Sequence, residues 1–261
     1  MAHAMPMIDI HVHLLPHYDD GPEDLEQAVE MVRVAAADGV EAMVATPHNV
    51  NWSPAHAHRR EEVEADVAAL QAEVARQGLG VRLYPGVEVY IAPDLVAQLR
   101  RGQAFPLCGS RYLLVEFPFG STPTYGEQVL FELQVQGLVP IVAHPERHAG
   151  VVEDPNLLYR WVGRGILAQV NAGSLLGQFG RRVEEVVRLL LEHDLVHFLG
   201  SDGHGPRHRP PLLREAAAKA ASVVGPERAA CLVQDWPAAV LADAPLDVPS
   251  PRPVKRRRWF W

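Results

Sequence analysis

The chain has 261 residues, of which 48% are hydrophobic and 21% charged, and its net charge is −8 at pH 7. This size and composition are typical of one α/β domain with a substantial core, and the acidic balance argues against a general nucleic-acid-binding protein. The two cysteines, Cys108 and Cys231, lie far apart, which argues against a disulfide framework. We find neither a signal-peptide pattern nor a run of the ~18–20 apolar residues that a membrane span needs, and we expect a cytoplasmic protein without membrane insertion.

Apolar runs of strand length alternate with helical patterns about seven times along the chain. We predict strands over residues 8–13, 40–45, 81–84, 112–117, 139–143, 166–171 and 196–199. We predict helices over residues 23–38, 53–78, 93–100, 125–136, 156–162, 181–193, 212–223 and 226–241. The strands are almost continuously apolar, which indicates a parallel sheet covered by helices.

Histidine or a carboxylate follows six of these apolar runs. The segments are IDIHVH (8–13), VATPH (44–48), YPGVE (84–88), LVEF (114–117), IVAHPER (141–147) and LGSDGH (199–204). Because strand ends converge on one face of a parallel barrel, we expect these side chains to form one site. The fold class we predict is α/β, a distorted seven-unit (β/α)7 TIM-like barrel. It forms a single domain over residues 7–244, followed by a Pro-rich, basic tail over 245–261 that we expect to be mobile.

The residue types at these strand ends indicate metal binding. His11 and His13 are two positions apart on a strand, so their imidazoles point to the same side and can share one cation. Glu88 can bridge two cations through its separate oxygens. Glu116 lies in an apolar strand, where an ionised carboxylate needs a cation or an arginine as partner. Asp20 lies in a DDG turn, and turn chemistry alone is the alternative explanation for it.

The candidate metal ligands share nitrogen or oxygen donors and include no cysteine. They are His11, His13, Asp20, His48, Glu88, Glu116, His144, Asp202 and His204. One cation takes about four to six ligands, so this set predicts two to three clustered divalent cations. Manganese is our first choice, and iron and zinc also suit imidazole with carboxylate.

Several longer stretches resemble one known family. They include MIDIHVHLL, PGVE, LLVEFP, GLVPIVAHPER, QVNAGSLLGQFG and SDGH. They are similar to the PHP (polymerase and histidinol phosphatase) superfamily, and within it to the manganese-dependent protein-tyrosine phosphatases of bacterial capsule and exopolysaccharide loci (the CpsB/YwqE type). The resemblance runs from Met7 to about Leu213. It implies the PHP fold, a distorted seven-unit barrel with a trinuclear metal centre.

The resemblance also implies roles for individual residues. One metal would be held by His11, His13, Glu88 and Asp202, a second by Glu88, Glu116 and His144, and a third by Asp20, His48 and His204. Arg147 and Arg209 match the family's phosphate-binding arginines, although Arg207 lies close enough to replace Arg209. The chain departs from the family at Asn49 and Asn171, where histidine and threonine are frequent.

The activity expected from these residues is metal-assisted hydrolysis of a phosphomonoester by a metal-bridging hydroxide. A phenolate, with a pKa of about 10, leaves more readily than an alkoxide, which favours phosphotyrosine on proteins. By resemblance, the partner would be the tyrosine-rich tail of a bacterial tyrosine kinase. The alternatives are a small-molecule phosphatase such as histidinol phosphatase, a nucleic-acid phosphoesterase, or a catalytically decayed, metal-stabilised binding module. A cysteine phosphatase is excluded, because C-x5-R would require arginine at Leu114 or Pro237.

Overall fold

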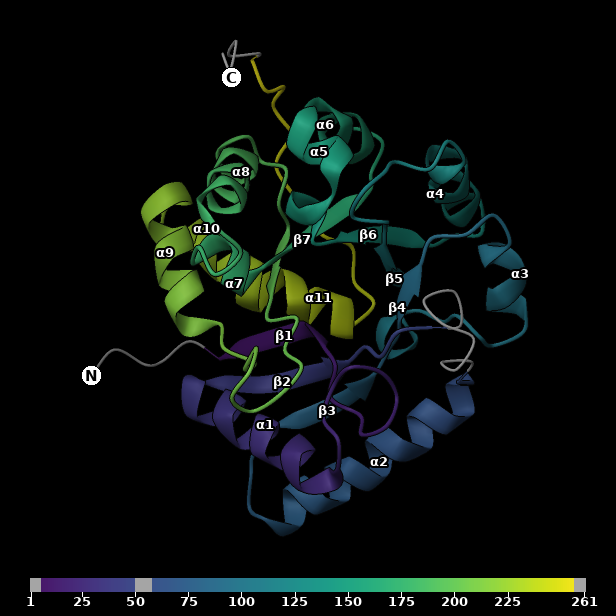
Figure 1. Ribbon diagram of the computed structural model, residues 1–261, viewed down its shortest axis with the longest axis vertical. Coiled ribbons are helices and arrows are strands. Elements are labelled where there is room, and N and C mark those ends of the chain that lie inside the picture. The colour runs from purple at the N-terminus through teal and green to yellow at the C-terminus, as the bar shows by residue number, and fades with distance from the viewer. Residues whose placement is uncertain (1–5, 50–57, 256–261) are drawn as a thin grey trace.

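The computed structural model describes residues 6–49 and 58–255. Parallel strands occupy the middle of the molecule and helices pack around them (Figure 1). The strands are β1 (Met7–Val12), β2 (Val40–Ala45), β3 (Arg82–Pro85), β4 (Glu88–Tyr90), β5 (Tyr112–Glu116), β6 (Val139–Ala143), β7 (Leu167–Asn171) and β8 (Phe198–Gly200). Their alternation with helices confirms the predicted α/β fold of seven βα units, in which β3 and β4 together take the place of one strand.

The strands form two sheets, in the orders β1-β2-β3 and β4-β5-β6-β7-β8. Single parallel bridges link the two sheets, from Val12 to Gly203 and from His48 to Glu88. Both bridges lie near the carboxyl-terminal ends of β1 and β2, where the predicted ligands are found. The two sheets therefore form a distorted barrel, and the bridges between them lie close to the candidate site.

The third predicted strand is interrupted where the sequence reads Pro-Gly-Val. Strand β3 ends at Pro85 and β4 begins at Glu88, so the prediction of one strand over 81–84 missed β4. A Cβ atom on Gly86 would lie 2.8 Å from the Leu107 side chain and 2.9 Å from the Val44 side chain. Only glycine allows the backbone to pass this closely. After the break, β4 pairs with β5 in the second sheet, and Glu88 also forms the single bridge to His48 in the loop after β2.

Strand β1 shows how the sequence places polar groups inside the barrel. The whole strand is buried. Successive side chains of a strand point to opposite faces, so Ile8 and Ile10 pack into the apolar core while His11 points to the interior. The chain then leaves the strand, with the His13 backbone N–H donating to the Gly203 carbonyl over 2.9 Å.

The helices surround the strands, and most of the predicted helices match observed ones to within a few residues at each end. They are α1 (Leu25–Asp38), α2 (Arg60–Arg76), α3 (Leu95–Arg100), α4 (Gly126–Val135), α5 (Ala149–Glu153), α6 (Asn156–Val162), α7 (Ala172–Leu175), α8 (Arg181–Glu192), α9 (Arg214–Val224), α10 (Pro226–Ala230) and α11 (Trp236–Leu241). Helix α1 begins where the Asp24 side chain accepts from the Gln27 N–H and ends at Gly39, whose φ of 93° suits only glycine well.

Two predicted helices differ from the structure. The last one, over 226–241, is divided by a π-helical turn at Cys231–Asp235. Because Pro237 has no N–H, it cannot bond to the carbonyl four residues earlier, and the regular helix starts again around it. The predicted helix start at Ser53–Pro54 lies outside the described residues, and α2 is described from Arg60.

The part of the C-terminal segment that the structure describes packs on the barrel. The Trp236 indole N–H donates to the Asp247 carbonyl over 3.0 Å, and the Asn156 side chain exchanges two hydrogen bonds of 2.9 Å with the backbone of Val254. The Arg252 N–H donates to the His193 carbonyl over 2.9 Å. These contacts are more extensive than a mobile tail implies. The boundary after residue 244 stays a prediction, and 256–261 lie outside the described residues. Within the described ranges, no helix has the length and apolar character that crossing a membrane requires.

Candidate metal centre

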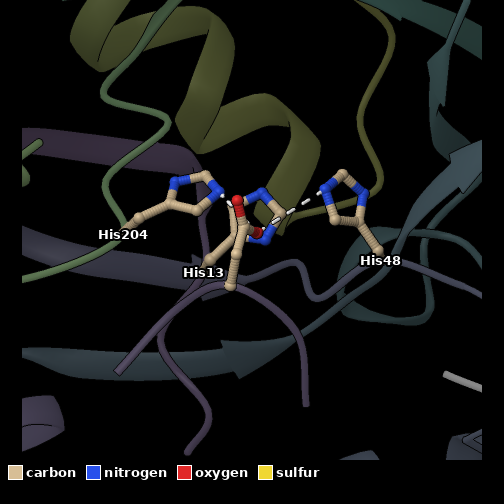
Figure 2. A group of neighbouring side chains, drawn as sticks. His13, His48 and His204 are labelled. Carbon is tan, nitrogen blue, oxygen red and sulfur yellow. Dashed lines mark ion pairs between the residues drawn. The ribbon is translucent and has the colours of Figure 1, made fainter. Parts of the chain in front are cut away.

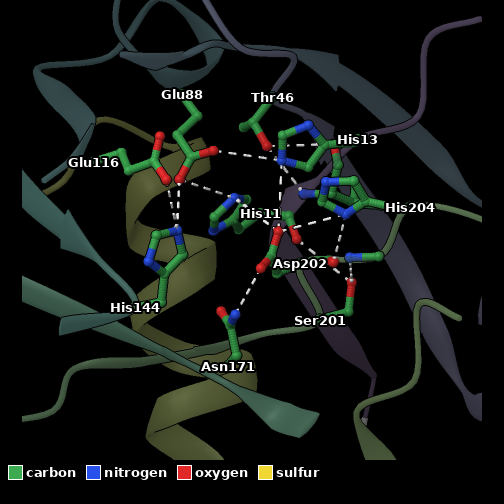
Figure 3. Close-up of polar contacts among 12 residues, drawn as sticks. His11, His13, Thr46, Glu88, Glu116, His144, Asn171, Ser201, Asp202 and His204 are labelled. Carbon is green, nitrogen blue, oxygen red and sulfur yellow. Dashed lines mark hydrogen bonds and ion pairs between the residues drawn. The ribbon is translucent and has the colours of Figure 1, made fainter. Parts of the chain in front are cut away.

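The nine predicted donors lie together at the carboxyl-terminal end of the barrel. Figure 3 labels all of them except Asp20 and His48. The nine donors form overlapping groups in which one donor atom of each residue lies within 4.8 Å of the others. The groups are His13 with Asp20, His48 and His204; His11 with His13 and Asp202; His11 with Glu88 and His144; and His48 with Glu88 and Glu116. Shared members between groups are typical of a cluster of cations rather than of separate sites.

Glu88 lies at the middle of the cluster. Its Oε1 is 3.0 Å from His144 Nε2 and 3.4 Å from His11 Nε2. Its Oε2 is 3.1 Å from His48 Nδ1 and 3.4 Å from His13 Nε2. The two oxygens therefore face different pairs of imidazoles. This is the arrangement that a carboxylate bridging two cations needs, and it comes from β4, the strand that the sequence did not predict.

Asp20, His48 and His204 form an outer group, which includes the most exposed of the candidate ligands, Asp20. Figure 2 labels His48 and His204 beside His13. His204 Nε2 is 3.1 Å from Asp20 Oδ1, and His48 Nε2 is 4.0 Å from the same oxygen. The Asp20 side chain is 52% exposed, so this group opens towards solvent. The His13 ring stacks on the His204 ring with 3.9 Å between centroids. His13 thus lies within reach of the outer group, to which the resemblance did not assign it.

Hydrogen bonds at Nδ1 orient three of the histidines. The pairs are His11 with Gln169 Oε1 at 2.8 Å, His13 with Asp19 Oδ2 at 2.7 Å, and His204 with the Asp202 carbonyl at 2.8 Å. Each partner is an acceptor, so each Nδ1 carries the proton and donates it. Nε2 then faces the cluster, and its lone pair becomes available to a cation when the proton on it is displaced. Metal-binding histidines in proteins are commonly held in this way.

Asp19 and Gln169 were not identified from the sequence. Asp19 precedes the predicted ligand Asp20, and the DDG turn offered two carboxylates without showing which one meets a histidine. Gln169 lies on β7 and reaches His11 across the barrel, so only the tertiary structure relates them. The approach depends on Gly200, because a Cβ atom there would lie 2.7 Å from Gln169 Nε2 and 3.0 Å from His11 Cβ.

Asp202 connects the cluster to both predicted arginines. Its Oδ1 lies 3.5 Å from the Nε2 atoms of His11 and His13. Its Oδ2 accepts from Arg209 and from Asn171 Nδ2, both over 2.6 Å, and lies 3.8 Å from Arg147. One oxygen is thus turned to the imidazoles and the other to the guanidinium groups.

This placement favours Arg209 over the alternative Arg207, which is exposed at the surface. Glu146, the sequence neighbour of Arg147, is a second carboxylate near this arginine. Glu146 is buried and its Oε1 accepts from the Asn171 backbone N–H over 2.9 Å. The Arg147 guanidinium instead lies between two aromatic rings, 4.5 Å from the centroid of Phe119 and 4.5 Å from that of Phe179.

Three of the candidate residues have left-handed backbone conformations. The φ angles are 31° for His144, 51° for Asp202 and 54° for Arg209. Such angles are uncommon for residues other than glycine, and each costs about 1–3 kcal/mol. For His144 and Asp202 the conformation turns the chain sharply just after a strand, which keeps the side chain at the mouth of the barrel. Backbone strain of this kind is concentrated at functional sites.

The pKa shifts of the carboxyl and imidazole groups indicate that the cluster favours bound positive charge. Burial alone would raise the pKa of the Glu88 carboxyl, but His11 and His48 outweigh it and hold that pKa well below its usual range. Burial and the neighbouring Glu88 raise the pKa of Glu116 to about 8. Burial opposes charge on His11, yet Glu88 and Asp202 raise its pKa to about 9. Protons on the imidazoles thus balance the carboxylates, and cations can replace those protons.

Two other sequence features have structural explanations. Asn49, which stands where the family often has histidine, donates to Gln98 Oε1 and accepts from the Tyr90 N–H, each over 3.0 Å. Asn49 thus links the loop after β2 to strand β4 through the bond from Tyr90. Burial raises the pKa of the Cys108 thiol to about 12, so this cysteine does not supply a thiolate nucleophile at neutral pH.

The fold and the donor set together define a distorted α/β barrel with a buried histidine and carboxylate cluster compatible with metal binding. Residues 7–242 match the family model for capsular polysaccharide synthesis proteins of the CpsB/CapC type. The chain belongs to this family.

Individual relatives agree with this membership. The chain is 34% identical to the tyrosine-protein phosphatase YwqE of Bacillus subtilis, over 97% of this chain and 99% of that protein. It is 36% identical to the putative tyrosine-protein phosphatase CapC of Staphylococcus aureus, over 80% and 81%. A solved structure from a study of YwqE from Bacillus subtilis and CpsB from Streptococcus pneumoniae, described as metal-dependent tyrosine phosphatases, superposes with a TM-score of 0.90. That match has 33% identity and covers 96% of this chain and 100% of the other.

Proposed function

We propose that this protein is a metal-dependent phosphatase that hydrolyses phosphotyrosine on proteins. The observation that carries the proposal is the placement of two arginines at Asp202, beside a buried histidine and carboxylate cluster. The similarity to tyrosine-protein phosphatases over nearly the whole chain supports the same activity.

The residues present fit two to three divalent cations. His11 Nε2, His13 Nε2, Glu88 Oε2 and Glu116 Oε2 are buried and have no hydrogen-bond partner within 6–49 and 58–255. Buried polar atoms without partners are costly, and cations would satisfy them. By the family resemblance we assign one cation to His11, His13, Glu88 and Asp202, a second to Glu88, Glu116 and His144, and a third to Asp20, His48 and His204. The donor groups in the structure contain the same nine residues in partly different combinations. Manganese is the metal we propose, because imidazole with carboxylate suits it.

The chain's own side chains have separate tasks in the proposed reaction. When bound, the cations would lower the pKa of a coordinated water and stabilise negative charge on the phosphate. Arg147 and Arg209 would bind the non-bridging phosphate oxygens, because a planar guanidinium can donate to two oxygens at once. Asp202 holds Arg209 at the edge of the cluster, and Asn171 donates to the same Asp202 oxygen. Asp19 keeps the His13 ring in the tautomer that presents Nε2.

Phosphotyrosine suits this site for a chemical reason. A phenolate with a pKa of about 10 leaves with less protonation than an alkoxide. The substrate protein that we propose is a bacterial tyrosine kinase with a tyrosine-rich tail, acting in the cytoplasm. The match to a family of capsular polysaccharide synthesis proteins supports a role in polysaccharide regulation.

A turnover panel with p-nitrophenyl phosphate, a phosphotyrosine peptide, histidinol phosphate and single-stranded DNA tests the proposal. We expect hydrolysis of the two aryl phosphates, loss of turnover after chelation and recovery when manganese is added. A clear preference for histidinol phosphate would assign the protein to small-molecule metabolism. Full turnover by protein shown to be metal-free would refute the metal dependence.

A further inference from the structure

A groove of about 540 Å³ lies next to Arg147. Helices α5 and α8, which lie next to each other in Figure 1, supply part of its lining, including Val152 and Val183. Phe119 and Phe179 line it as well. This volume is in the range of sites that hold small organic ligands. Charged residues, among them Glu153 and Arg182, line it too, so the groove offers a mixed lining with an apolar part beside a proposed phosphate-binding arginine.

Phe119 joins the groove to the metal centre. Its ring centroid lies 5.4 Å from that of the candidate ligand His144, and the Arg147 guanidinium carbon lies 4.5 Å above the same ring. Phe119 is 43% exposed, although it is large and apolar. Phe179 lies at the same 4.5 Å from Arg147. The exposed Phe119 ring contacts both a candidate metal ligand and a proposed phosphate-binding arginine. It can therefore contact the organic group that is esterified to the phosphate.

We propose that Phe119 is a specificity-determining residue that packs against the aromatic ring of the substrate, with the groove receiving that ring. This inference rests on the proposed phosphatase function. With the phosphate held by Arg147, the esterified group must extend away from the metals, and Phe119 is the apolar surface that lies between His144 and the groove. Phe179 lies at the same distance from Arg147 and also lines the groove; the contact with His144 distinguishes Phe119. An aromatic contact together with the burial of apolar surface is worth on the order of tenfold in affinity.

Binding of phosphonates separates ring recognition from phosphate recognition and from hydrolysis. Benzylphosphonate carries the ring and methylphosphonate does not, and neither is hydrolysed. Their dissociation constants would be measured by calorimetry on manganese-loaded wild type, Phe119→Ala and Phe119→Leu. We expect Phe119→Ala to weaken benzylphosphonate on the order of tenfold more than it weakens methylphosphonate, whose binding reports any change at Arg147. Phe119→Leu should lie between the two, because it keeps apolar surface but loses the ring.

Phe131→Ala is the matched control, because Phe131 is 64% exposed on α4 and does not line the groove. It should change neither constant. Equal weakening of both phosphonates by Phe119→Ala would overturn the inference, since Phe119 would then act only through Arg147. Unchanged benzylphosphonate binding in that variant would overturn it as well. If the wild type instead binds neither phosphonate and hydrolyses no phosphomonoester, the proposed function itself fails, and this inference with it.

Discussion

Replacing Asp19 with asparagine should weaken metal binding without unfolding the protein. Asp19 Oδ2 lies 2.7 Å from His13 Nδ1, and the same carboxylate accepts from the backbone N–H groups of His48 and Gly21. His13 lowers the pKa of Asp19 to about 2 although burial opposes this, so the carboxylate is ionised at neutral pH. Asparagine loses the charge and keeps one acceptor oxygen, which can take the place of Oδ1 for the Gly21 N–H or of Oδ2 for the His48 N–H, but not of both. If its amide N–H₂ faces His13 Nδ1, the ring proton moves to Nε2 and blocks that atom as a ligand.

Loss of such a supporting carboxylate typically costs about 10–100-fold in metal affinity or activity, or roughly 1.4–2.7 kcal/mol. The assay is competition for manganese against a chromophoric chelator, combined with elemental analysis and kcat/KM on an aryl phosphate. Asp38→Asn is the control, because Asp38 also accepts from two backbone N–H groups, those of Leu213 and Arg214, but contacts no histidine of the cluster. Wild-type manganese affinity and turnover in a folded Asp19→Asn variant would refute the reasoning and leave Asp19 as a turn residue only.

Other predictions follow from the same geometry. Glu88→Ala should bind fewer metal equivalents by elemental analysis and lose more activity than Asn49→His, because Glu88 oxygens face two pairs of imidazoles; equal kinetics for Glu88→Ala and wild type would mean a structural role. Arg147→Ala should keep its metals and fold while kcat/KM on a phosphotyrosine peptide falls on the order of 10²–10³; unchanged turnover would remove Arg147 from the site. Burial lowers the pKa of His197 to about 3, whereas the unfolded chain protonates this ring below its ordinary pKa of about 6.5. Its stabilisation is therefore complete above that pH and is lost as the pH falls towards 3, by roughly 2 kcal/mol at about pH 5. His197→Asn keeps an acceptor for the Ala168 N–H, so its free energy of unfolding, measured with denaturant, should fall less than that of the wild type between about pH 7 and about pH 5; parallel curves would contradict this.

Several parts of the fold could be predicted because they depend on local pattern. The strands over 40–45 and 139–143 and the helix over 156–162 were predicted with the bounds that the structure has. Each is a compact apolar or amphipathic run between turn residues. The break between β3 and β4 was missed, because it depends on how closely Gly86 passes its neighbours and not on periodicity.

The sequence by itself determined which residue types stand at the ends of the strands, and therefore that a histidine and carboxylate cluster would form at one end of an α/β barrel. It determined this because strand direction and side-chain alternation are local properties. Only the tertiary structure decided that Asp19 and Gln169 orient His13 and His11, and that Phe119 lies between His144 and the groove. Those relations join segments far apart in the chain, and hydrogen bonds and ring contacts depend on distances that only the packed barrel fixes.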